Sequence, residues 1–385
     1  MKILFVHNSY SEKNPSGEEY ASQELASLLV EHGHEVRWFR RNSDEVRRGF
    51  GPFKAFFTGI YNPFSAKALG IVLDDFKPDI VQVQNIYPLL SSSIFKPINN
   101  RGIPVVMRCP NYRLFCPNGL CLSAKGEVCE KCFGGKEWNC ILHNCEKNML
   151  KSIGYALRGW YSRITRNILD SVNIFIVQSE FQKRKFVYQG IQESKIAILP
   201  GIAPRVHVDE YKLGDYCAFV GRVSAEKGIY EYIEAARCCP NILFKVAGLL
   251  SSNFVMPQEL PPNLEFVGFL RGKELDDFYQ NSRIVIVPSK WYEGFPNVIL
   301  RAMMHRKPVV TTNIGCLPEI IHEGKNGLIV NPGNEKALGV VIRSLFYNCQ
   351  MCESLGKQGE VDVAEKYTSE RIYNRLIATY GRIQY

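Results

Sequence analysis

Short runs of β-branched and apolar residues alternate with longer amphipathic stretches along most of the chain. In the first half, the runs that predict strands are residues 3–6, 36–39, 80–84, 105–107 and 174–177. The stretch 18–32 between the first two runs has a helical period and ends at Gly33, as a helix C-terminus would. This alternation is typical of parallel α/β layers.

A second series of predicted strands begins near Cys217. Its strands are expected at residues 217–220, 242–246, 264–267, 284–287, 309–312 and 328–330, and its helices include residues 228–236, 273–279 and 297–305. Two series with separate starts predict an α/β protein with two Rossmann-like domains, residues 1–200 and 201–360. The linker is expected around residues 202–212, and residues 361–385 form a further helical segment.

Composition narrows the class of protein. The chain has 385 residues, of which 46% are hydrophobic and 22% are charged, which excludes a disordered chain, a collagen-like fibre and a small disulfide scaffold. No apolar run approaches the roughly 20 residues that span a bilayer. The first run stops at His7 and Asn8 without a cleavage-like segment, so we expect a buried strand and a cytoplasmic protein.

The net charge of +9 lies mostly in the first half. Residues 1–190 hold 25 Lys and Arg against 17 Asp and Glu, whereas the rest of the chain holds 22 against 21. Such an excess favours an anionic partner, although a solvated basic surface is commoner. We expect no nucleic-acid partner, because the chain lacks a nucleic-acid-binding module and interleaved aromatic and basic residues.

Two loops of the second series carry residues suited to a phosphate group. The loop after strand 217–220 contains Gly221, which allows close backbone approach, and the cations Arg222 and Lys227. The other loop leads through Glu293 and Pro296 into helix 297–305, whose first N–H groups form an anion site. A carboxylate beside a bare phosphate is unfavourable, so Glu293 indicates a hydroxyl-rich group attached to that phosphate, as in a nucleotide sugar.

The chain resembles the family 4 glycosyltransferases, which are retaining enzymes with two Rossmann-like domains facing each other across a cleft, the GT-B fold. The segments that carry the resemblance are 15–19, 33–34, 77–81, 111–113, 219–222, 226–228, 247–248, 266–269, 293–296, 308–310, 315, 318–319 and 326–328. The resemblance implies transfer from a UDP- or GDP-linked sugar to a saccharide or lipid-linked acceptor, in surface polysaccharide or glycoconjugate synthesis. It also implies that residues 361–385 return to the N-terminal domain.

The resemblance also implies roles for individual residues. Arg222 and Lys227 would neutralise the donor diphosphate, Glu293 would face the transferred sugar as a catalytic residue, and Asn111 would be catalytic in the first domain. The other donor-binding residues that it implies are Gly17, Gly268, Phe269, Leu270, Gly294, Phe295, Pro296, Asn297, Val298 and Arg301. No metal or other cofactor is required for the reaction.

Three positions depart from the family pattern. The second Glu of the Glu-x7-Glu motif falls at Arg301, which cannot accept a hydroxyl hydrogen bond, and Pro110 and Gln84 stand where relatives have His. The alternative is therefore a catalytically weak nucleotide-sugar-binding or accessory protein on the same fold. In a retaining reaction the leaving phosphate can take the acceptor proton, so the imidazole expected at Pro110 is dispensable.

Residues 116–145 interrupt the first series as a cysteine-rich insert. It holds six of the thirteen cysteines: Cys116, Cys121, Cys129, Cys132, Cys140 and Cys145. The last four could hold a structural zinc ion, and thiols without metal are the alternative. Disulfides are disfavoured in a reducing cytosol.

An amphipathic pattern follows the insert. Apolar residues recur at steps of three or four at Leu150, Ile153, Leu157, Trp160, Ile164 and Ile168, and no acidic residue occurs between residues 147 and 169. We expect an ordinary domain helix that packs this apolar face on the sheet. The alternative is a basic amphipathic helix that makes a peripheral contact with the inner face of a membrane.

Overall fold

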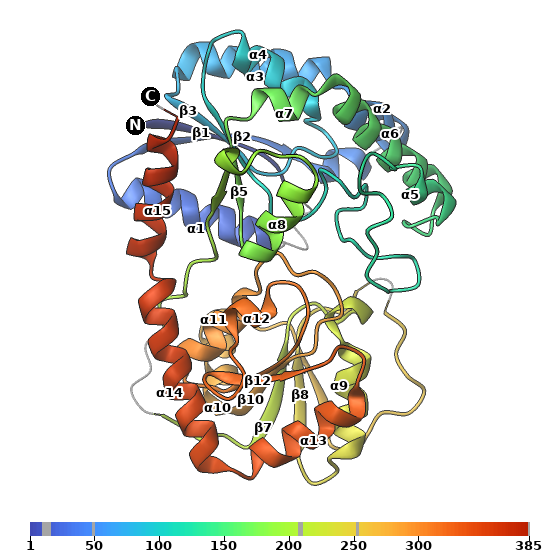
Figure 1. Ribbon diagram of the computed structural model, residues 1–385, viewed down its shortest axis with the longest axis vertical. Helices are drawn as coiled ribbons and strands as arrows, with labels where there is room; N and C mark the ends of the chain where they lie inside the picture. The colour runs from blue at the N-terminus through green and yellow to red at the C-terminus, as the bar shows by residue number, and fades with distance from the viewer. Residues whose placement is uncertain (10–16, 48–50, 207–210, 252–253, 384–385) are drawn as a thin grey trace. The chain divides into compact units, whose positions relative to one another are not determined.

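The computed structural model describes residues 1–9, 17–47, 51–206, 211–251 and 254–383, and the chain forms two compact units. The first unit comprises Met1–Lys125, Cys129–Ile202 and Ser369–Tyr385, and the second comprises Gly126–Val128 and Ala203–Thr368. Each unit contains one six-stranded parallel sheet with helices (Figure 1). The predicted α/β class with two Rossmann-like domains is confirmed.

The sheet of the first unit has the strand order β2-β1-β3-β4-β5-β6. Its strands are β1 (Lys2–Ser9), β2 (Glu35–Asn42), β3 (Ile80–Val83), β4 (Val105–Arg108), β5 (Ile174–Val177) and β6 (Ile196–Ile198). Strands β3, β4 and β5 are buried along their whole length, as strands of a parallel sheet covered on both faces are. The strand order reverses between β1 and β3, and ligands bind at such switch points in doubly wound sheets.

The helices of the first unit include a C-terminal one. They are α1 (Gly17–Glu31), α2 (Gly51–Ile60), α3 (Pro63–Phe76), α4 (Phe95–Asn99), α5 (Asn139–Leu142), α6 (Met149–Thr165), α7 (Asn167–Ser171), α8 (Glu180–Tyr188) and α15 (Ser369–Gly381). Ile372, Leu376 and Tyr380 of α15 share a core with Ile3 and Leu25. The end of the chain therefore completes the core of the first unit from Ser369 onward.

The sheet of the second unit has the order β12-β11-β10-β7-β8-β9, which is the order of the dinucleotide-binding fold. Its strands are β7 (Tyr216–Val220), β8 (Leu243–Ala247), β9 (Leu264–Gly268), β10 (Ser282–Val287), β11 (Val309–Thr312) and β12 (Gly327–Val330). Its helices are α9 (Ile229–Cys238), α10 (Gly272–Asn281), α11 (Asn297–Met304), α12 (Leu317–Ile320), α13 (Glu335–Phe346) and α14 (Cys349–Lys366). The switch point lies between β7 and β10.

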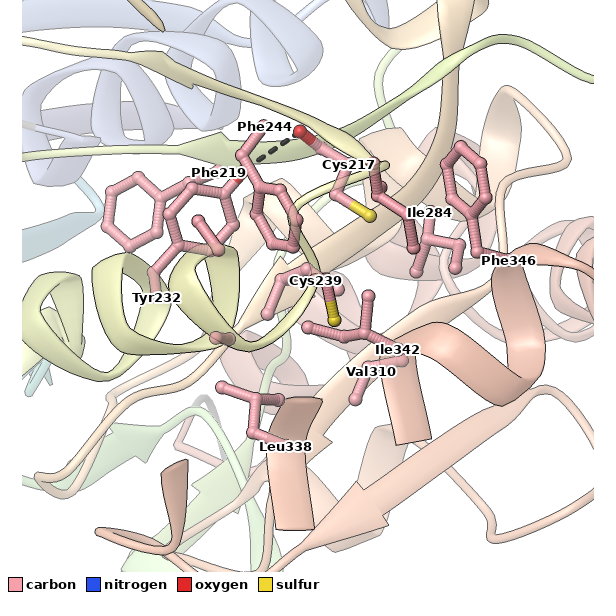
Figure 2. Packing of buried hydrophobic residues seen from close by; sticks show 14 of the residues in the cluster. Cys217, Phe219, Tyr232, Cys239, Phe244, Ile284, Val310, Leu338, Ile342 and Phe346 are labelled. Carbon is pink, nitrogen blue, oxygen red and sulfur yellow. Dashed lines mark hydrogen bonds between the residues drawn. The ribbon is translucent and has the colours of Figure 1, made fainter. Parts of the chain in front are cut away.

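An aromatic cluster fixes β7 in the second unit (Figure 2). The ring of Tyr232 lies 5.5 Å from that of Phe219 and 5.2 Å from that of Phe244. Its hydroxyl donates to the Cys217 carbonyl oxygen at 2.7 Å, so the buried polar tip is satisfied. These contacts therefore fix the position of β7, the strand that leads into the loop with Arg222 and Lys227.

The sequence patterns predict the described strands well, and they fail at two places. Every predicted strand is present within three residues of its expected ends, and β6 is an additional strand of three residues. The helical pattern that was expected to run through Ile168 is broken at Arg166, whose φ of 51° separates α6 from α7. Within the described ranges, no helix combines the length and the apolar composition that crossing a bilayer requires.

The expected burial of the apolar face of α6 is wrong for three of its residues. Leu150 is 73% exposed, Trp160 47% and Ile164 49%. The buried positions of the helix are Ser152, Gly154, Ala156 and Arg158 instead, and a Cβ added at Gly154 would lie 2.9 Å from the Phe56 ring. Close packing against α2 thus requires glycine at that position, which leaves the larger apolar residues outside.

Candidate functional site

The loops after β7 and β10 meet at the switch point of the second unit. Gly228 has a φ of 79°, and a Cβ at this position would lie 1.9 Å from the Pro288 carbonyl oxygen, so only glycine fits. The Lys290 N–H donates to the Glu226 carbonyl oxygen at 2.9 Å. These contacts bring the loop that carries Lys227 against the loop that carries Glu293.

Lys227 and Glu293 form a close ion pair in this site. The Lys227 Nζ lies 2.8 Å from each carboxylate oxygen of Glu293, and the Ser289 hydroxyl donates to Oε1 at 2.6 Å. The Glu293 side chain is only 5% exposed. Burial raises the pKa of Glu293, but the Lys227 charge and the hydrogen bonds outweigh it and hold the pKa below its ordinary value. Glu293 is therefore a fixed anion.

Arg222 is more exposed than Lys227. Its guanidinium donates to Glu226 at 2.6 Å, and its side chain is half-exposed. Exposed pairs of this kind are weak, so the guanidinium is able to exchange Glu226 for another anion.

The N-terminus of α11 follows Glu293 in the same loop. Pro296 is the N-cap residue of α11, and no side chain caps the helix. The Asn297 amide oxygen is buried and has no hydrogen-bond partner among the described residues. Uncapped N–H groups and the helix dipole at this point suit an anionic group.

The other residues of the second half that the resemblance assigned to donor binding lie in this unit too. Gly268 ends β9 with a φ of 81°, and Phe269 beside it is half-exposed. Leu270, Phe295 and Val298 pack against a hydrophobic core, which fixes the backbone around them. Gly294 lies between Glu293 and Phe295 in the loop. The donor roles of these residues stay predictions.

The Arg301 side chain has a partner within the second unit. It forms an ion pair with Asp276 of α10, and His305 Nε2 lies 3.2 Å from the same carboxylate. The charge of Arg301 is therefore balanced within the unit by Asp276, which no sequence motif marks.

Two predicted site residues belong to the first unit. Gly17 begins α1, and residues 15 and 16, which belong with it to the resemblance segment 15–19, lie outside the described residues. Asn111 follows β4, and its Oδ1 accepts from the Arg113 N–H at 3.0 Å. Asn111 and Pro110 line a small pocket together with Gln84.

The cysteine insert does not assemble the predicted zinc ligands. In the part of the chain that the structure describes, no group of three or more His, Cys, Asp or Glu side chains is arranged to hold a metal ion. Cys129, Cys132, Cys140 and Cys145 therefore do not fit a zinc site in this arrangement, and all are free thiols. A hydrogen bond between the Cys140 and Cys145 thiols lowers the pKa of Cys145.

Sequence reasoning misses two polar residues of these sites. Ser289, which orients Glu293, lies two residues after the end of β10. Its position just after a predicted strand is the signal that could have identified it. Arg108 ends β4 as a buried cation inside an apolar run, which is itself an unusual pattern.

Comparison with known proteins identifies what this site resembles. Residues 208–362 match the family model described as "Glycosyl transferases group 1". The chain is 25% identical over 353 residues to an uncharacterized 42.6 kDa protein in the cps region of Klebsiella pneumoniae. That match covers 83% of this chain and 87% of the Klebsiella protein. It is 26% identical over 231 residues to the capsular polysaccharide biosynthesis glycosyltransferase CapM of Staphylococcus aureus, which covers 54% of this chain and 60% of that protein.

The fold is similar to a solved structure of Anabaena Alr3699/HepE in complex with UDP and glucose. The TM-score is 0.66 at 16% sequence identity, and the match covers 100% of both chains. At this identity the likeness shows a shared fold.

Proposed function

We propose that this chain, whose residues 208–362 match the group 1 glycosyltransferase family, moves a sugar from a nucleoside-diphosphate sugar to a saccharide or lipid-linked acceptor. The observation that carries the proposal is the Lys227–Glu293 pair at the uncapped start of α11. It sets a fixed carboxylate beside an anion site, as a sugar attached to a diphosphate requires.

Lys227 and Arg222 are the proposed diphosphate ligands. An ammonium group has three N–H donors, and two of those of Lys227 point to the Glu293 oxygens, which leaves the third for a phosphate oxygen. Arg222 would leave Glu226 for a phosphate, where its planar guanidinium can donate two parallel hydrogen bonds. The charge that grows on the leaving diphosphate would be stabilised by these groups and by the α11 N–H groups. No metal ion is required in this scheme.

The proposed transfer retains the configuration at the anomeric carbon. The bond from that carbon to the diphosphate oxygen breaks, and a bond to the acceptor hydroxyl oxygen forms on the same face. The acceptor proton passes to the leaving diphosphate oxygen, so no protein base is needed at Pro110. Glu293 would hold hydroxyl groups of the sugar, since an ionised carboxylate only accepts hydrogen bonds.

The outward face of α6 supports a peripheral contact with an anionic membrane. Leu150, Trp160 and Ile164 are exposed along one side of the helix, and Lys147 and Lys151 are exposed near its start. Apolar and aromatic side chains beside lysines are the composition of helices that lie in a membrane interface. A lipid-linked acceptor would be presented at such a surface. The similarity to CapM, which is named for capsular polysaccharide biosynthesis, is consistent with a role in surface polysaccharide assembly.

The experiment that tests the function is release of nucleoside diphosphate from a panel of UDP- and GDP-sugars, with and without extracts that contain candidate acceptors. We expect release with one donor, stimulation by one extract, and a product with the anomeric configuration of the donor by NMR. Glu293→Gln should slow the stimulated release. Donor binding without release under any condition would contradict transfer and favour an accessory donor-binding protein.

A further inference from the structure

A small pocket lies at the switch point of the sheet in the first unit. It is lined by residues that follow β3, among them Gln84 and Asn85, by Arg108 and Asn111 at the end of β4, and by Glu18 of α1. The pocket thus lies where doubly wound sheets bind ligands, outside the carboxyl ends of strands beside the order reversal.

Arg108 is a cation buried at this pocket. It is 4% exposed, and its Nη1 reaches the Ser22 hydroxyl only at 3.5 Å. Among the residues that the structure describes, no carboxylate lies within ion-pairing distance of it, although Glu18 acts on it from further away. A buried charge without a close counterion is strongly unfavourable unless an anion binds there.

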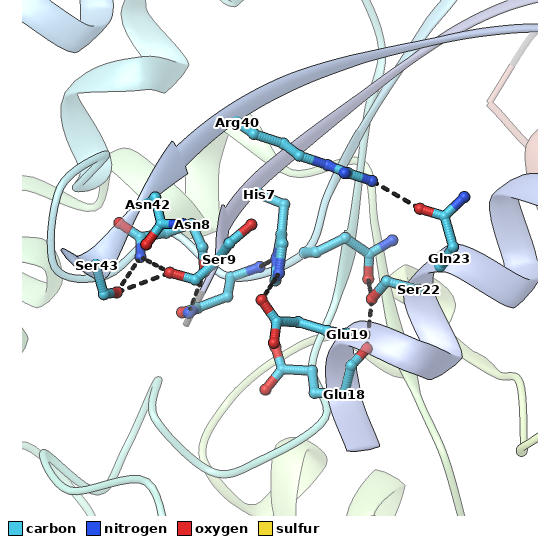
Figure 3. A network of polar contacts seen from close by, with 12 residues as sticks. His7, Asn8, Ser9, Glu18, Glu19, Ser22, Gln23, Arg40, Asn42 and Ser43 are labelled. Atoms are coloured by element: carbon cyan, nitrogen blue, oxygen red, sulfur yellow. Dashed lines mark hydrogen bonds and ion pairs between the residues drawn. The ribbon is translucent and has the colours of Figure 1, made fainter. Parts of the chain in front are cut away.

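Gln84 supplies a second, independent sign of a ligand. It is 2% exposed, and its Oε1 accepts weakly from the Ser22 hydroxyl at 3.4 Å. Its Nε2 is buried and has no hydrogen-bond partner in the described part of the chain. Figure 3 shows Ser22 directed toward Glu18 of its own helix, where its hydroxyl donates to the Glu18 carbonyl oxygen at 2.8 Å. The single Ser22 hydroxyl hydrogen is thus shared mainly with Glu18, so Ser22 is a weak partner for Gln84 Oε1 and does not pair with Nε2.

The charges around the pocket favour a negative ligand. Arg113 also lines it and donates to the Asn85 Oδ1 at 2.8 Å, so the lining holds two guanidinium groups and one carboxylate, that of Glu18. Glu24 acts on Arg108 and Glu146 acts on Arg113 from outside the lining. The nearby His7 is neutral at ordinary pH, because burial and the charges of Arg40 and Arg108 lower its pKa to about 4.

We propose that this pocket binds an anionic group, a carboxylate or a phosphate, that a saccharide substrate carries. Arg108 would pair with the anion, and the Gln84 amide would donate to one of its oxygens. The inference rests on the proposed function only in taking the ligand to be a sugar. The anion belongs either to the acceptor or to the transferred sugar.

Binding of simple probes to the full chain tests the pocket without any turnover. We would measure binding of glucuronate, glucose 6-phosphate and neutral glucose by NMR titration. We expect at least one anionic probe to bind tenfold or more tightly than glucose, and Gln84→Leu and Arg108→Gln to remove that preference. Arg101→Gln, which alters an exposed surface pair with Asp74, is the matched control and should change nothing.

Gln84→Leu keeps the shape and removes an unsatisfied donor, so it should raise the melting temperature without ligand while weakening the anionic probe. Equal binding of charged and neutral probes, or unchanged probe binding in Gln84→Leu, would overturn the proposal even if Arg108→Gln failed to fold. Turnover of UDP-glucuronate over UDP-glucose would assign the anion to the transferred sugar, and a preference for acidic acceptors would assign it to the acceptor. Probe binding in a protein that transfers no sugar would refute the proposed function and leave the pocket standing.

Discussion

The ammonium group of Lys227 lies 2.8 Å from both oxygens of the Glu293 carboxylate, although 66 residues separate the two in the chain. The pair joins the loops after β7 and β10, and it fixes the direction in which the carboxylate faces. Glu293→Gln keeps the shape and removes the charge. We expect turnover to fall roughly tenfold to a thousandfold, because removing one well-placed polar group from a site costs a few kcal/mol.

The matched variant for Glu293→Gln is Ser289→Ala, which removes one hydrogen bond to the same carboxylate and keeps its charge. Its loss of turnover should be the smaller one. Initial rates with the preferred donor measure both. Full specific activity in folded Glu293→Gln would defeat the catalytic assignment.

Substitutions of Lys227 and Arg222 should have similar effects on donor binding but different effects on the stability of the protein. Each substitution to Met should weaken donor binding about tenfold to a hundredfold, as the loss of a charge-assisted contact does. Lys227→Met also leaves the buried Glu293 carboxylate without its counterion, which typically costs about 3–5 kcal/mol of stability. Arg222→Met breaks only an exposed pair and should cost at most about 1 kcal/mol. Calorimetry and thermal unfolding check the two effects, and equal melting temperatures would contradict the structural distinction.

Arg301 should matter for packing between α11 and α10. Arg301→Glu sets a carboxylate against Asp276, so we expect a lower melting temperature. The double variant Arg301→Glu with Asp276→Arg restores opposite charges and should recover most of the loss. Donor affinity that falls in the double variant as far as in the single one would instead indicate that Arg301 contacts the donor phosphate.

The sequence predicts the strands because each contains a short run rich in β-branched and apolar residues, and it predicts the loop residues because they follow those runs. It does not predict that Lys227 pairs with Glu293, since that contact depends on β7 and β10 being neighbours in the sheet. For α6, the period correctly groups Leu150, Trp160 and Ile164 on one face. The period carries no information on which face packs, and Gly154 against Phe56 decides it.

Acid should destabilise the first unit through His7. Burial, with the Arg40 and Arg108 charges, lowers its pKa to about 4 from 6.5, so the unfolded chain binds the proton more tightly. The stability due to the neutral ring is fully present above about pH 6.5 and is lost as the pH falls toward 4, by up to about 3 kcal/mol. His7→Gln should flatten the fall in melting temperature between pH 6.5 and 5, where most carboxylates are still ionised. An unchanged pH profile in that variant would show that other groups control acid stability.

The exposed face of α6 should bind anionic vesicles. We expect the protein to sediment with vesicles of phosphatidylcholine and phosphatidylglycerol, weakly with phosphatidylcholine alone, and less at high salt, because each lysine near the surface contributes about 1 kcal/mol. Leu150→Ser with Trp160→Ser removes apolar area, and Lys147→Glu with Lys151→Glu reverses charge, so each double variant should lose most of the binding. Val340→Ser is the control, because Val340 is 57% exposed on α13 of the second unit. Donor hydrolysis in solution should be unaffected in all three, since none of these residues belongs to the loops that carry Lys227 and Glu293. Vesicle binding that survives both double variants, or that Val340→Ser reduces equally, would rule out α6 as the membrane surface.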